Sequence, residues 1–543
     1  MLAAVRSAAV LGIEAYDVTV EVDAARGLPQ FSVVGMPAGA VRESRERVSA
    51  AIVNAGFVLP PRRLTVNLAP ADIRKEGTAF DLPIALGILA ATGQLAASAV
   101  EDLVVVGELG LDGSIRAIRG ALPVARRVSR AGARAILVLP SPNVSEASLV
   151  ASIQLSAPAT LSELVDALRA GRVPNTAHKA APRSEDQSSP DFSDVAGQRA
   201  AKRALEVAAA GAHNLLLVGP PGAGKTMLAR RLAGILPSLT EDERLEATAI
   251  HSVAGMLSDG TVDARPFRAP HHSVSVAGLV GGGGMPRPGE VSLAHHGVLF
   301  LDELLEFPRH VLDALRQPLE DGRVVVSRAS GAVAFPARFT LVGAMNPCPC
   351  GYAGDATHAC SCAAAEVARY RARLSGPLAD RIDMHVTVGA VDVRTLGSVS
   401  GGETSPAVRA RVEAARDVQR KRYATLRRVS CNAHVAGRWL DARTPILPAA
   451  RELLTNAAER LGLSARGYHR VLKVARTIAD LDEAPAIGEG QIAEALRYRP
   501  ATTNGGDATS VTPSRPLSGG APSDLADNWQ DDRTPFHARD ATR

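Results

Sequence analysis

The clearest chemistry in the sequence lies in "LLLVGPPGAGKTMLA", where an apolar run ends in a glycine-rich loop and a helix-forming segment follows. The spacing Gly219-x4-Gly224-Lys225-Thr226 is that of a phosphate-binding loop, whose backbone N–H groups curl around phosphate oxygens at a helix N-terminus. We therefore expect the loop to bind ATP, Lys225 to reach the β- and γ-phosphates, and the Thr226 hydroxyl to ligate Mg²⁺. The residues of the loop are Gly219, Pro220, Pro221, Gly222, Ala223, Gly224, Lys225 and Thr226.

A second apolar run, "HGVLFLDEL", ends in two carboxylates, Asp302 and Glu303. Open α/β sheets bind their ligands at the carboxyl ends of the strands, so this pair is expected beside the phosphate loop. Asp302 is expected to hold Mg²⁺ through water, and Glu303 to orient and polarise an attacking water. The alternative is two solvated carboxylates that open the following helix. The loop and the acidic pair together predict an ATPase.

A third apolar run, "RFTLVGAMN", ends at Asn346. An amide at this end of the sheet is expected to contact both the γ-phosphate and the attacking water. The alternative is an asparagine that caps its own turn, a common position for this residue.

The elements that must position these residues follow from hydrophobic periodicity. Residues 1–170 alternate as strands and helices of a first α/β domain, and residues 171–193 are a polar, Pro- and Ser-rich linker. Residues 194–388 alternate β and α segments, which predicts a parallel sheet flanked by helices. Residues 389–500 are helical in pattern. The tail, residues 501–543, is poor in apolar residues and is expected to be disordered.

Composition limits the partners. The 543 residues carry a net charge of +5, which is compatible with nucleic acid but decides little, and aromatic residues are scarce at 3%. Base-stacking platforms are therefore not the main binding device. The N-terminal segment resembles a signal peptide only weakly, because Arg6 and Glu14 interrupt it, and the apolar run 82–91 is too short to span a bilayer. We expect a cytoplasmic protein with no membrane partner.

Four of the five cysteines lie in "NPCPCGYAGDATHACSC", as the pairs Cys348/Cys350 and Cys360/Cys362. Two pairs across a short loop suit tetrahedral Zn²⁺ with four thiolates, although C-x-C pairs are less typical than C-x-x-C. Such a site is structural because it leaves no open coordination position. His358 is an alternative ligand. Disulfides, which require an oxidising compartment, and buried free thiols are the other interpretations.

The motifs "GPPGAGKT", "VLFLDE", "GAMNPCPCG" and "RLSGPLADRID", in this order, resemble the magnesium-chelatase-like branch of the AAA+ ATPases. Within that branch, residues 1–499 resemble the ComM/YifB family, with "RPFRAPHHSVSVAGLVGGG" and "PGEVSLAHHGVLFLDEL" as the longest matching stretches. The resemblance implies an AAA+ P-loop core of α/β class with a helical lid. It also implies a homo-oligomeric ring, a hexamer, with ATP bound between subunits.

The resemblance also implies roles for two arginines. Arg381 in "LADRID" matches the position from which such proteins project an arginine into the neighbour's nucleotide, and a planar guanidinium suits the charge of the transferring phosphoryl group. The alternatives are a structural salt bridge with Asp380 or Asp383, and Arg373 as the projecting arginine.

The second arginine is Arg466 in "LSARGYHRV", which matches the lid arginine that contacts nucleotide from the helical domain. Arg470 is close enough in sequence to leave the choice between them open.

Two inserts interrupt the minimal ATPase pattern. Residues 266–296 contain four consecutive glycines, which do not favour a helix or strand interior, so we expect a mobile loop. "GRVVVSRASGAVAFPARF" predicts a hairpin. Related ring ATPases point such inserts into the central channel, so Arg328, with His271 and His272, is expected to touch a DNA backbone; the alternative is an ordinary exposed turn.

The first domain contains "RKEGTAFDLPIAL" and "GELGLDGSIRAIRGALPVARR", which resemble the proteolytic domain of Lon, of the ribosomal-S5-domain-2-like α+β fold. Such enzymes activate a serine with a nearby lysine. Ala79 occupies the place of the serine and Pro123 that of the lysine, so the catalytic pair is lost and peptidase activity is not expected.

Together these patterns favour an ATP-driven motor on single-stranded or branched DNA, with helicase or branch-migration activity in recombination of incoming single-stranded DNA, as in natural transformation. This substrate follows from the family resemblance. The alternative is a chelatase-type ATPase that remodels a protein partner, although no integrin-type metal-binding domain occurs here. An ATP-dependent Lon-like protease is excluded by Ala79.

Overall fold

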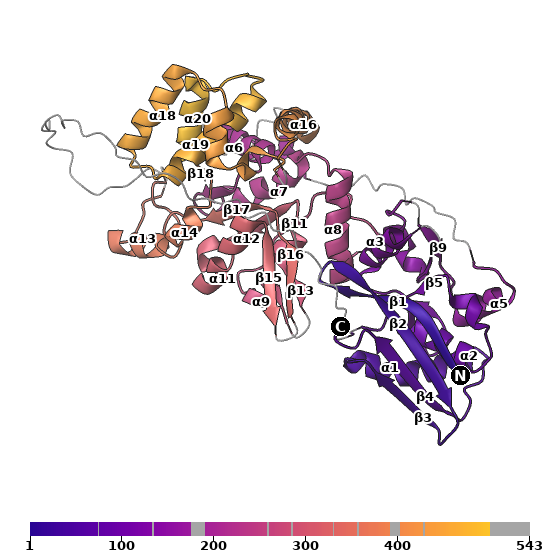
Figure 1. Ribbon diagram of the computed structural model, residues 1–543. Coiled ribbons are helices and arrows are strands. Elements are labelled where there is room, and N and C mark those ends of the chain that lie inside the picture. Colours follow the sequence, from indigo (N-terminus) through magenta and orange to yellow (C-terminus); the bar gives the residue numbers. More distant parts are fainter. Residues whose placement is uncertain are drawn as a thin grey trace, which may run out of the picture. The chain divides into compact units, whose positions relative to one another are not determined.

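The computed structural model (Figure 1) describes residues 1–499 except for several internal gaps. The tail, most of the linker and the tip of the predicted hairpin therefore lie outside the described residues. No helix in the described ranges is both long and apolar enough to cross a membrane. The gaps are residues 74, 76, 133–134, 152, 175–189, 258–259, 284–285, 329–330, 356–357, 391–401 and 427–428.

The N-terminal residues build a seven-stranded sheet with strand order β3-β4-β2-β1-β5-β8-β9. Its core contains the apolar helix α2 (Asp81–Ala91), which is buried along its whole length. The strands are β1 (Leu2–Leu11), β2 (Glu14–Ala25), β3 (Gln30–Val34), β4 (Arg63–Ala69), β5 (Leu103–Val105), β8 (Ile136–Val138) and β9 (Gln154–Ser156). The other main helices are α1 (Gly39–Asn54), α3 (Ala121–Ala131) and α5 (Leu161–Arg169).

The segment that weakly resembles a signal peptide is a strand. β1 pairs antiparallel with β2 over its whole length, and Arg6 lies opposite Thr19 in this ladder. Its first half alternates exposed and buried residues, with Val5 fully buried. Arg6 interrupts the apolar stretch because it occupies the solvent face of a half-buried strand.

The ATPase segment forms a five-stranded sheet in the order β11-β14-β17-β10-β18. All neighbouring pairs are parallel, which confirms the predicted parallel sheet. The helices α6 (Arg199–Gly211) and α7 (Lys225–Ile235) pack against it. The strands are β10 (Leu215–Val218), β11 (Phe267–Arg268), β14 (Val298–Leu301), β17 (Thr340–Met345) and β18 (Met384–Thr387).

The two faces of this sheet belong to different hydrophobic cores. Leu215 and Leu217 face a core shared with the C-terminal helices, whereas Leu216 faces a core shared with the hairpin. A parallel strand covered on both faces is apolar at every position, as "LLLV" is. The C-terminal helices are α16 (Ser405–Arg422), α17 (Gly437–Arg443), α18 (Pro448–Arg460), α19 (Ala465–Leu481) and α20 (Glu489–Arg497).

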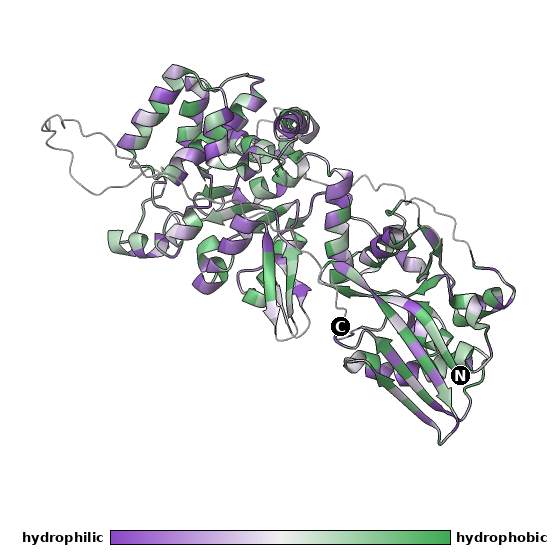
Figure 2. Ribbon diagram, viewed as in Figure 1, coloured by the Kyte–Doolittle hydropathy of each residue, from purple (hydrophilic) through white to green (hydrophobic). Residues whose placement is uncertain are grey.

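The two inserts have defined secondary structure. β15 (Arg323–Arg328) and β16 (Gly331–Pro336) form the predicted antiparallel hairpin, with Arg328 opposite Gly331. Figure 2 shows the hairpin as largely hydrophobic, and one face of it is buried in the core that includes Leu216. In the first insert, β12 (Gly281–Gly282) pairs with β13 (Arg287–Pro288). The expectation that the glycine run avoids strand structure is therefore wrong for its first two residues.

Candidate active site

The phosphate loop lies between β10 and α7, as predicted. Gly219 follows the last residue of β10, and its N–H donates to the carbonyl of Met345 in the adjacent strand β17 (3.2 Å). A Cβ at Gly219 would lie 2.1 Å from the carbonyl oxygen of Val388, so no larger residue fits there. Helix α7 begins at Lys225, so the free N–H groups of the first turn of this helix point toward the loop.

Lys225 joins the ends of two strands. Its ammonium donates to the carbonyls of Gly219 (2.7 Å) and Pro220 (2.8 Å) and to Asn346 Oδ1 (3.1 Å). Burial lowers the pKa of Lys225, and the charge of Asp302 opposes that shift. The structure thus brings Asn346 and Lys225 together, as expected of residues that follow adjacent strands.

The two predicted Mg²⁺ ligands touch one another. The Thr226 hydroxyl donates to Asp302 Oδ2 at 2.6 Å. Oxygen donors of this kind are those that Mg²⁺ prefers, and Mg²⁺ bound with phosphates usually takes only one or two from the protein. The pair therefore fits a magnesium ion bound together with a phosphate.

Glu303 has an unusual backbone. Its φ of 50° and ψ of 47° lie in the left-handed region, which costs a residue with a Cβ about 1–2 kcal/mol. Its N–H donates to Asp302 Oδ1 (3.0 Å), and its side chain is 63% exposed. Such strain persists where a site needs a particular side-chain direction.

A histidine lies beside this carboxylate. His272 Nδ1 is 3.6 Å from Glu303 Oε2, and the His272 ring meets His271 (centroids 4.0 Å apart) and the edge of Phe307 (6.4 Å). The sequence predicted His271 and His272 only as DNA contacts, which stays a prediction, and missed the contact with Glu303. Strand order carries the missing signal, since β11, which precedes His272, is the neighbour of β14, which precedes Glu303.

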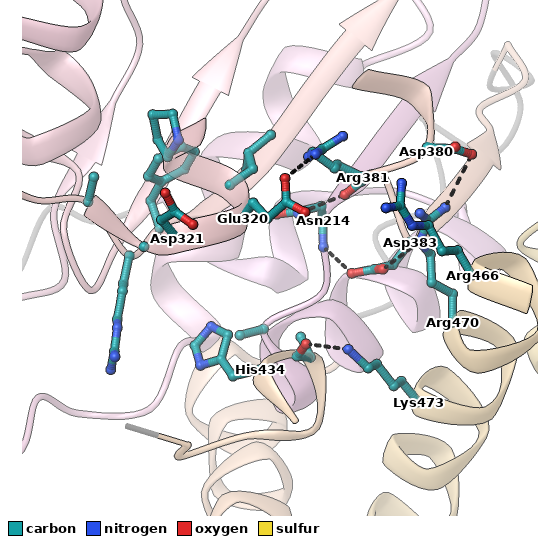
Figure 3. A pocket seen from close by; sticks show the side chains of 18 residues that line it. Asn214, Glu320, Asp321, Asp380, Arg381, Asp383, His434, Arg466, Arg470 and Lys473 are labelled. Carbon is teal, nitrogen blue, oxygen red and sulfur yellow. Dashed lines mark hydrogen bonds and ion pairs between the residues drawn. The ribbon is translucent and has the colours of Figure 1, made fainter. Parts of the chain in front are cut away.

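A cavity of about 380 Å³ lies at the other end of the sheet (Figure 3). Asn214 and Asp383, which line it, immediately precede the paired strands β10 and β18, so it lies at their amino ends. The cavity contains most of the cationic groups predicted to contact nucleotide. Its basic lining residues, besides His434, are Arg338, Arg381, Arg466, Arg470 and Lys473.

Arg381 is held in this cavity by a carboxylate that was not anticipated. Its guanidinium forms an ion pair with Glu320 of α12 (Arg316–Asp321). The alternative of a salt bridge with Asp380 or Asp383 is therefore wrong, since these two carboxylates lie 3.9 and 3.8 Å from Arg470 instead. The sequence offered no signal for Glu320, which is about 60 residues away.

Arg466 lies in the first turn of α19 and lines the same cavity as Arg470. Arg470 Nη1 is buried and donates no hydrogen bond among the described residues, and burial lowers the pKa of Arg470. Arg373 lies elsewhere, with Nη1 donating to the carbonyl of Leu305 (3.2 Å), two residues after Glu303. Arg381 and its alternative Arg373, the candidates for the arginine that projects into a neighbouring subunit, thus lie at opposite ends of the sheet.

The four cysteines come together. Sγ of Cys348 is 3.3 Å from Cys350 and 3.7 Å from Cys360, and all four sulfurs lie within 4.8 Å of one another. No disulfide joins them, and backbone N–H groups donate to their sulfurs, such as Cys350 N–H to Cys362 Sγ (3.3 Å). The His358 ring lies against Tyr352 instead (4.9 Å), so the alternative of His358 as a ligand is not supported.

Glu246, His295 and His296 form a second cluster with metal-ligand chemistry. Nδ1 of His295 accepts the N–H of Arg338 (2.9 Å), so its proton is on Nε2, which lies 3.1 Å from Glu246. A protonated nitrogen does not ligate a metal. The cluster is a hydrogen-bonded network, in which burial lowers the pKa of His295 to about 4.

The predicted DNA contacts can be placed only in part. Arg328 ends β15 at the hairpin, and nothing is described of its side chain. In the basic helix α16, Arg416 donates to the carbonyl of Ala209 (2.9 Å) and Arg422 to Asp480 (2.9 Å). These two arginines are bound within the protein and stabilise the fold.

The Lon-like positions lack catalytic groups. Ala79 precedes α2, Pro123 is buried in α3, and the Thr78 hydroxyl is taken up by the Glu108 carboxylate. The sequence missed Lys75, which is buried and whose ammonium has no hydrogen-bond partner among the described residues. Burial lowers the pKa of Lys75. Its side chain is not among the described groups that line the cavity of about 1000 Å³ beside Thr78 and Ala79.

Three family models match the chain. "Magnesium chelatase, subunit ChlI" matches residues 191–396, "Subunit ChlI of Mg-chelatase" residues 20–143, and "Magnesium chelatase, subunit ChlI C-terminal" residues 402–499. The chain is 45% identical over 504 residues to "Competence protein ComM" of Haemophilus influenzae, covering 92% of this chain and 97% of that protein. It is 43% identical over 508 residues to YifB of Salmonella typhimurium, with the same coverage. The "Magnesium-chelatase 38 kDa subunit" of Cereibacter sphaeroides is 28% identical over 177 residues, covering 29% of this chain and 52% of that protein.

Proposed function

Because the chain belongs to the ComM/YifB family of magnesium-chelatase-like AAA+ ATPases, we propose that it is an ATP-hydrolysing ring motor that acts on DNA. The ATPase part rests on one observation, the convergence of Lys225, the Thr226–Asp302 pair, Glu303 and Asn346 at the carboxyl ends of three adjacent strands. These groups are the ones that bind, orient and hydrolyse a nucleoside triphosphate in this class of site.

Each residue has a defined task in this proposal. Lys225 would exchange its contacts with the Gly219 and Pro220 carbonyls for phosphate oxygens. Thr226 directly, and Asp302 through water, would hold Mg²⁺, which would neutralise phosphate charge. Glu303 accepts a hydrogen bond from the attacking water and raises its nucleophilicity. Asn346, already 3.1 Å from Lys225, positions the water and the terminal phosphate.

The placement of Arg381 and Arg466 supports a ring. A distance of about 16 Å along β10 separates Asn214, at the amino end, from Gly219, and this exceeds the reach of an arginine side chain. A contact between either arginine and a nucleotide would therefore be made with the nucleotide of another subunit. Head-to-tail contacts of this kind close into rings, and we propose a hexamer.

DNA is supported as the substrate by the near full-length similarity to a protein named for competence. The pairwise match to the magnesium-chelatase 38 kDa subunit of Cereibacter sphaeroides covers only 29% of this chain, against 92% for the competence protein, so the protein-remodelling alternative is less supported. We propose branch migration or helicase activity on single-stranded or branched DNA during recombination, with Arg328 at the hairpin tip as a backbone contact. The proposed location is the cytoplasm, without a membrane partner, and the first domain acts without a peptidase activity.

The experiment that tests this function measures ATP turnover with and without forked and four-way DNA, together with strand displacement by the same preparation. We expect DNA to stimulate turnover and labelled strands to be displaced only with ATP. An intact ATPase with neither stimulation nor displacement would remove DNA as the substrate and leave the protein-remodelling function.

We also propose that the four cysteines hold a structural Zn²⁺. A zinc tetrahedron with Zn–S bonds of about 2.3 Å has sulfur–sulfur edges of about 3.8 Å. The three distances among the sulfurs of Cys348, Cys350 and Cys360 are 3.3, 3.6 and 3.7 Å, and the Cys362 sulfur lies within 4.8 Å of each of them. The backbone N–H groups that donate to Cys348 and Cys362 suit thiolates rather than neutral thiols.

The zinc proposal is tested by the metal content of the purified chain. We expect about one zinc per chain, reduced in Cys360→Ser but retained in Cys431→Ser, which changes the one cysteine outside the cluster. A fully active preparation without any bound metal would exclude the zinc and favour free thiols.

A further inference from the structure

Three exposed arginines lie together at one end of the N-terminal sheet. Arg63 is the first residue of β4, and its Cα partners are Ala25, the last residue of β2, and Gln30, the first residue of β3. Arg26 and Arg62 adjoin these paired residues in sequence, and all three arginines are on the surface. Since neighbouring strands lie about 4.8 Å apart, the ends of β2, β4 and β3, which lie side by side in Figure 1, span about 10 Å.

The protein does not neutralise these charges. In the part of the chain that the structure describes, the side chains of Arg26, Arg62 and Arg63 form no hydrogen bond and no ion pair. The nearest carboxylate along β2, that of Asp23, lies beside the N-terminal amine instead (3.6 Å). Arg127 of the same domain, by contrast, pairs with a carboxylate at 2.6 Å. Three guanidiniums are therefore available to an anionic partner.

An exposed leucine lies in the loop beside these arginines. Leu28 is 88% exposed, in the four-residue connection between β2 and β3. Gly27 before it has a φ of 153°, which favours glycine, and Pro29 after it restricts its backbone to extended conformations. The connection crosses the start of β4, where the N–H of Gln30 donates to the carbonyl of Arg62 (3.4 Å). The loop thus presents an apolar side chain on a restricted backbone next to the guanidiniums.

The loop that leads into β4 is also stiff. Pro60 and Pro61 precede the two arginines, and the N–H of Arg62 donates to the carbonyl of Pro60 (2.8 Å). Proline reduces the number of conformations of a free loop, so less conformational entropy is lost when a partner binds. Both loops at this end of the sheet are therefore suited to bind a partner without rearrangement.

We propose that this end of the first domain is a DNA-binding tip, whose arginines contact the phosphate backbone while Leu28 packs against bases exposed at a fork or branch. Duplex DNA carries one phosphate charge per about 1.7 Å of its axis, so a span of about 10 Å faces enough phosphates for all three arginines. Apolar side chains such as leucine are inserted between bases by proteins that deform DNA, together with arginine contacts. The inference rests on the proposed function as a DNA motor, and it assigns the first domain a task in that function. The tip comprises Arg26, Leu28, Arg62 and Arg63.

An anionic membrane is the other surface to which arginines and an exposed leucine could bind. Besides Leu28, Met1 offers an exposed apolar side chain (66%) at this end, where its amine donates to the carbonyl of Ala24 (3.1 Å). Binding to a membrane surface usually takes the apolar face of a helix or an attached lipid, whereas the apolar groups here are single side chains on a loop and a strand end. The observations therefore favour DNA, and anionic vesicles are the competing probe.

The test measures binding of the full chain to labelled forked DNA and to a blunt duplex by fluorescence anisotropy over a range of salt concentrations. Each phosphate contact contributes about 0.9 to the slope of log affinity against log salt concentration. Replacing Arg26, Arg62 and Arg63 together by alanine should therefore lower this slope by at least about 2.7 and weaken binding to both DNAs. Leu28→Ala should weaken binding to the fork by about three- to tenfold and leave the duplex affinity unchanged.

Arg42→Ala is the matched control, since Arg42 is exposed in the first turn of α1, which follows the opposite end of β3. It should leave both affinities and the salt slope unchanged. If the wild type binds DNA and is stimulated by it, but the triple alanine variant has the same affinity and slope, the inference is overturned and the proposed function stands.

Two other outcomes would also overturn the inference. If the triple variant loses binding to anionic phosphatidylserine vesicles but retains DNA binding, the tip is a membrane contact. If the wild type neither binds DNA nor is stimulated by it, the proposed function fails and the inference fails with it.

Discussion

The first prediction is that Arg381 completes the catalytic site of a neighbouring subunit, because it lies at the opposite end of the sheet from the catalytic site of its own chain. Arg381 lies at the amino end of β10, whereas Glu303 and Lys225 lie at the carboxyl ends. A chain with Arg381→Ala keeps an intact Glu303, and a chain with Glu303→Gln keeps an intact Arg381. If the arginine serves a neighbour, mixing the two inactive chains restores complete sites.

The turnover that the mixture regains can be estimated from the loss in each variant and from the fraction of complete interfaces in a mixed ring. Loss of an arginine that stabilises the transferring phosphoryl group costs on the order of 10³-fold in turnover, and loss of the carboxylate costs on the order of 10²-fold or more. In an equimolar random ring, about one quarter of head-to-tail interfaces combine an intact Glu303 with an intact Arg381 from the neighbour. The mixture should therefore recover about one quarter of wild-type turnover.

The assay is steady-state phosphate release by rings assembled from co-expressed or mixed chains, with Arg309→Ala as a control for the loss of an exposed arginine. Arg381→Ala also removes the ion pair with Glu320, which is partly exposed and contributes less than about 1 kcal/mol to stability. A mixture no more active than its better parent would refute the action of Arg381 between subunits and return this arginine to a structural role.

Three further predictions concern single residues. Glu303→Gln should bind ATP but hydrolyse it at least about 100-fold more slowly, as measured by equilibrium binding and single-turnover hydrolysis; normal turnover would remove Glu303 from its role. Gly219→Ala places a Cβ 2.1 Å from the Val388 carbonyl, so ATP affinity measured by titration should fall by at least about tenfold. Gly376→Ala is the matched control, because its Cβ would meet no atom within 4 Å and its φ lies outside the left-handed region; it should leave ATP affinity unchanged, and an equal loss would contradict the packing argument. Burial lowers the pKa of His295 from its usual 6.5 to about 4, so the neutral form stabilises the fold above pH 6.5, and that contribution is lost as the pH falls toward 4. Urea unfolding should show a lower free energy of unfolding at pH 4.5 than at pH 7. This decrease should be smaller in His295→Gln than in the wild type, by up to about 3 kcal/mol, and an equal decrease in both proteins would exclude His295 as its source.

Local pattern predicted the parts of the site that follow strands. The phosphate loop, the acidic pair and Asn346 each end an apolar run, and a parallel sheet collects such ends at one edge, so their meeting could be expected without any coordinates. The four cysteines, within fifteen residues of one another, were likewise accessible from spacing.

Contacts between segments that are distant in the chain could not be predicted from the sequence. The pairing of Arg381 with Glu320 and of His272 with Glu303 depends on strand order and loop conformation, which no local period encodes. The strand β1 was not among the predicted strands, since a half-buried run of small apolar residues has the same composition as a weak signal sequence. Side-chain partners across loops require the three-dimensional arrangement.

The zinc proposal has a consequence for which kinetic step should fail when the metal is lost. The cysteine loop follows β17, whose neighbour β10 leads into the phosphate loop, and a Cβ at Gly351 would lie 2.6 Å from Pro221 Cδ. The cysteine loop therefore packs directly on the residues expected to bind phosphate. Glu303 follows β14, on the other side of β17, and none of the described contacts of the cysteines reaches it. Removing the metal should thus weaken ATP binding more than it slows hydrolysis at saturating ATP, so a higher KM with a nearly unchanged kcat is the expected result. A fall in kcat alone would place the influence of the cysteine loop on Asn346 instead.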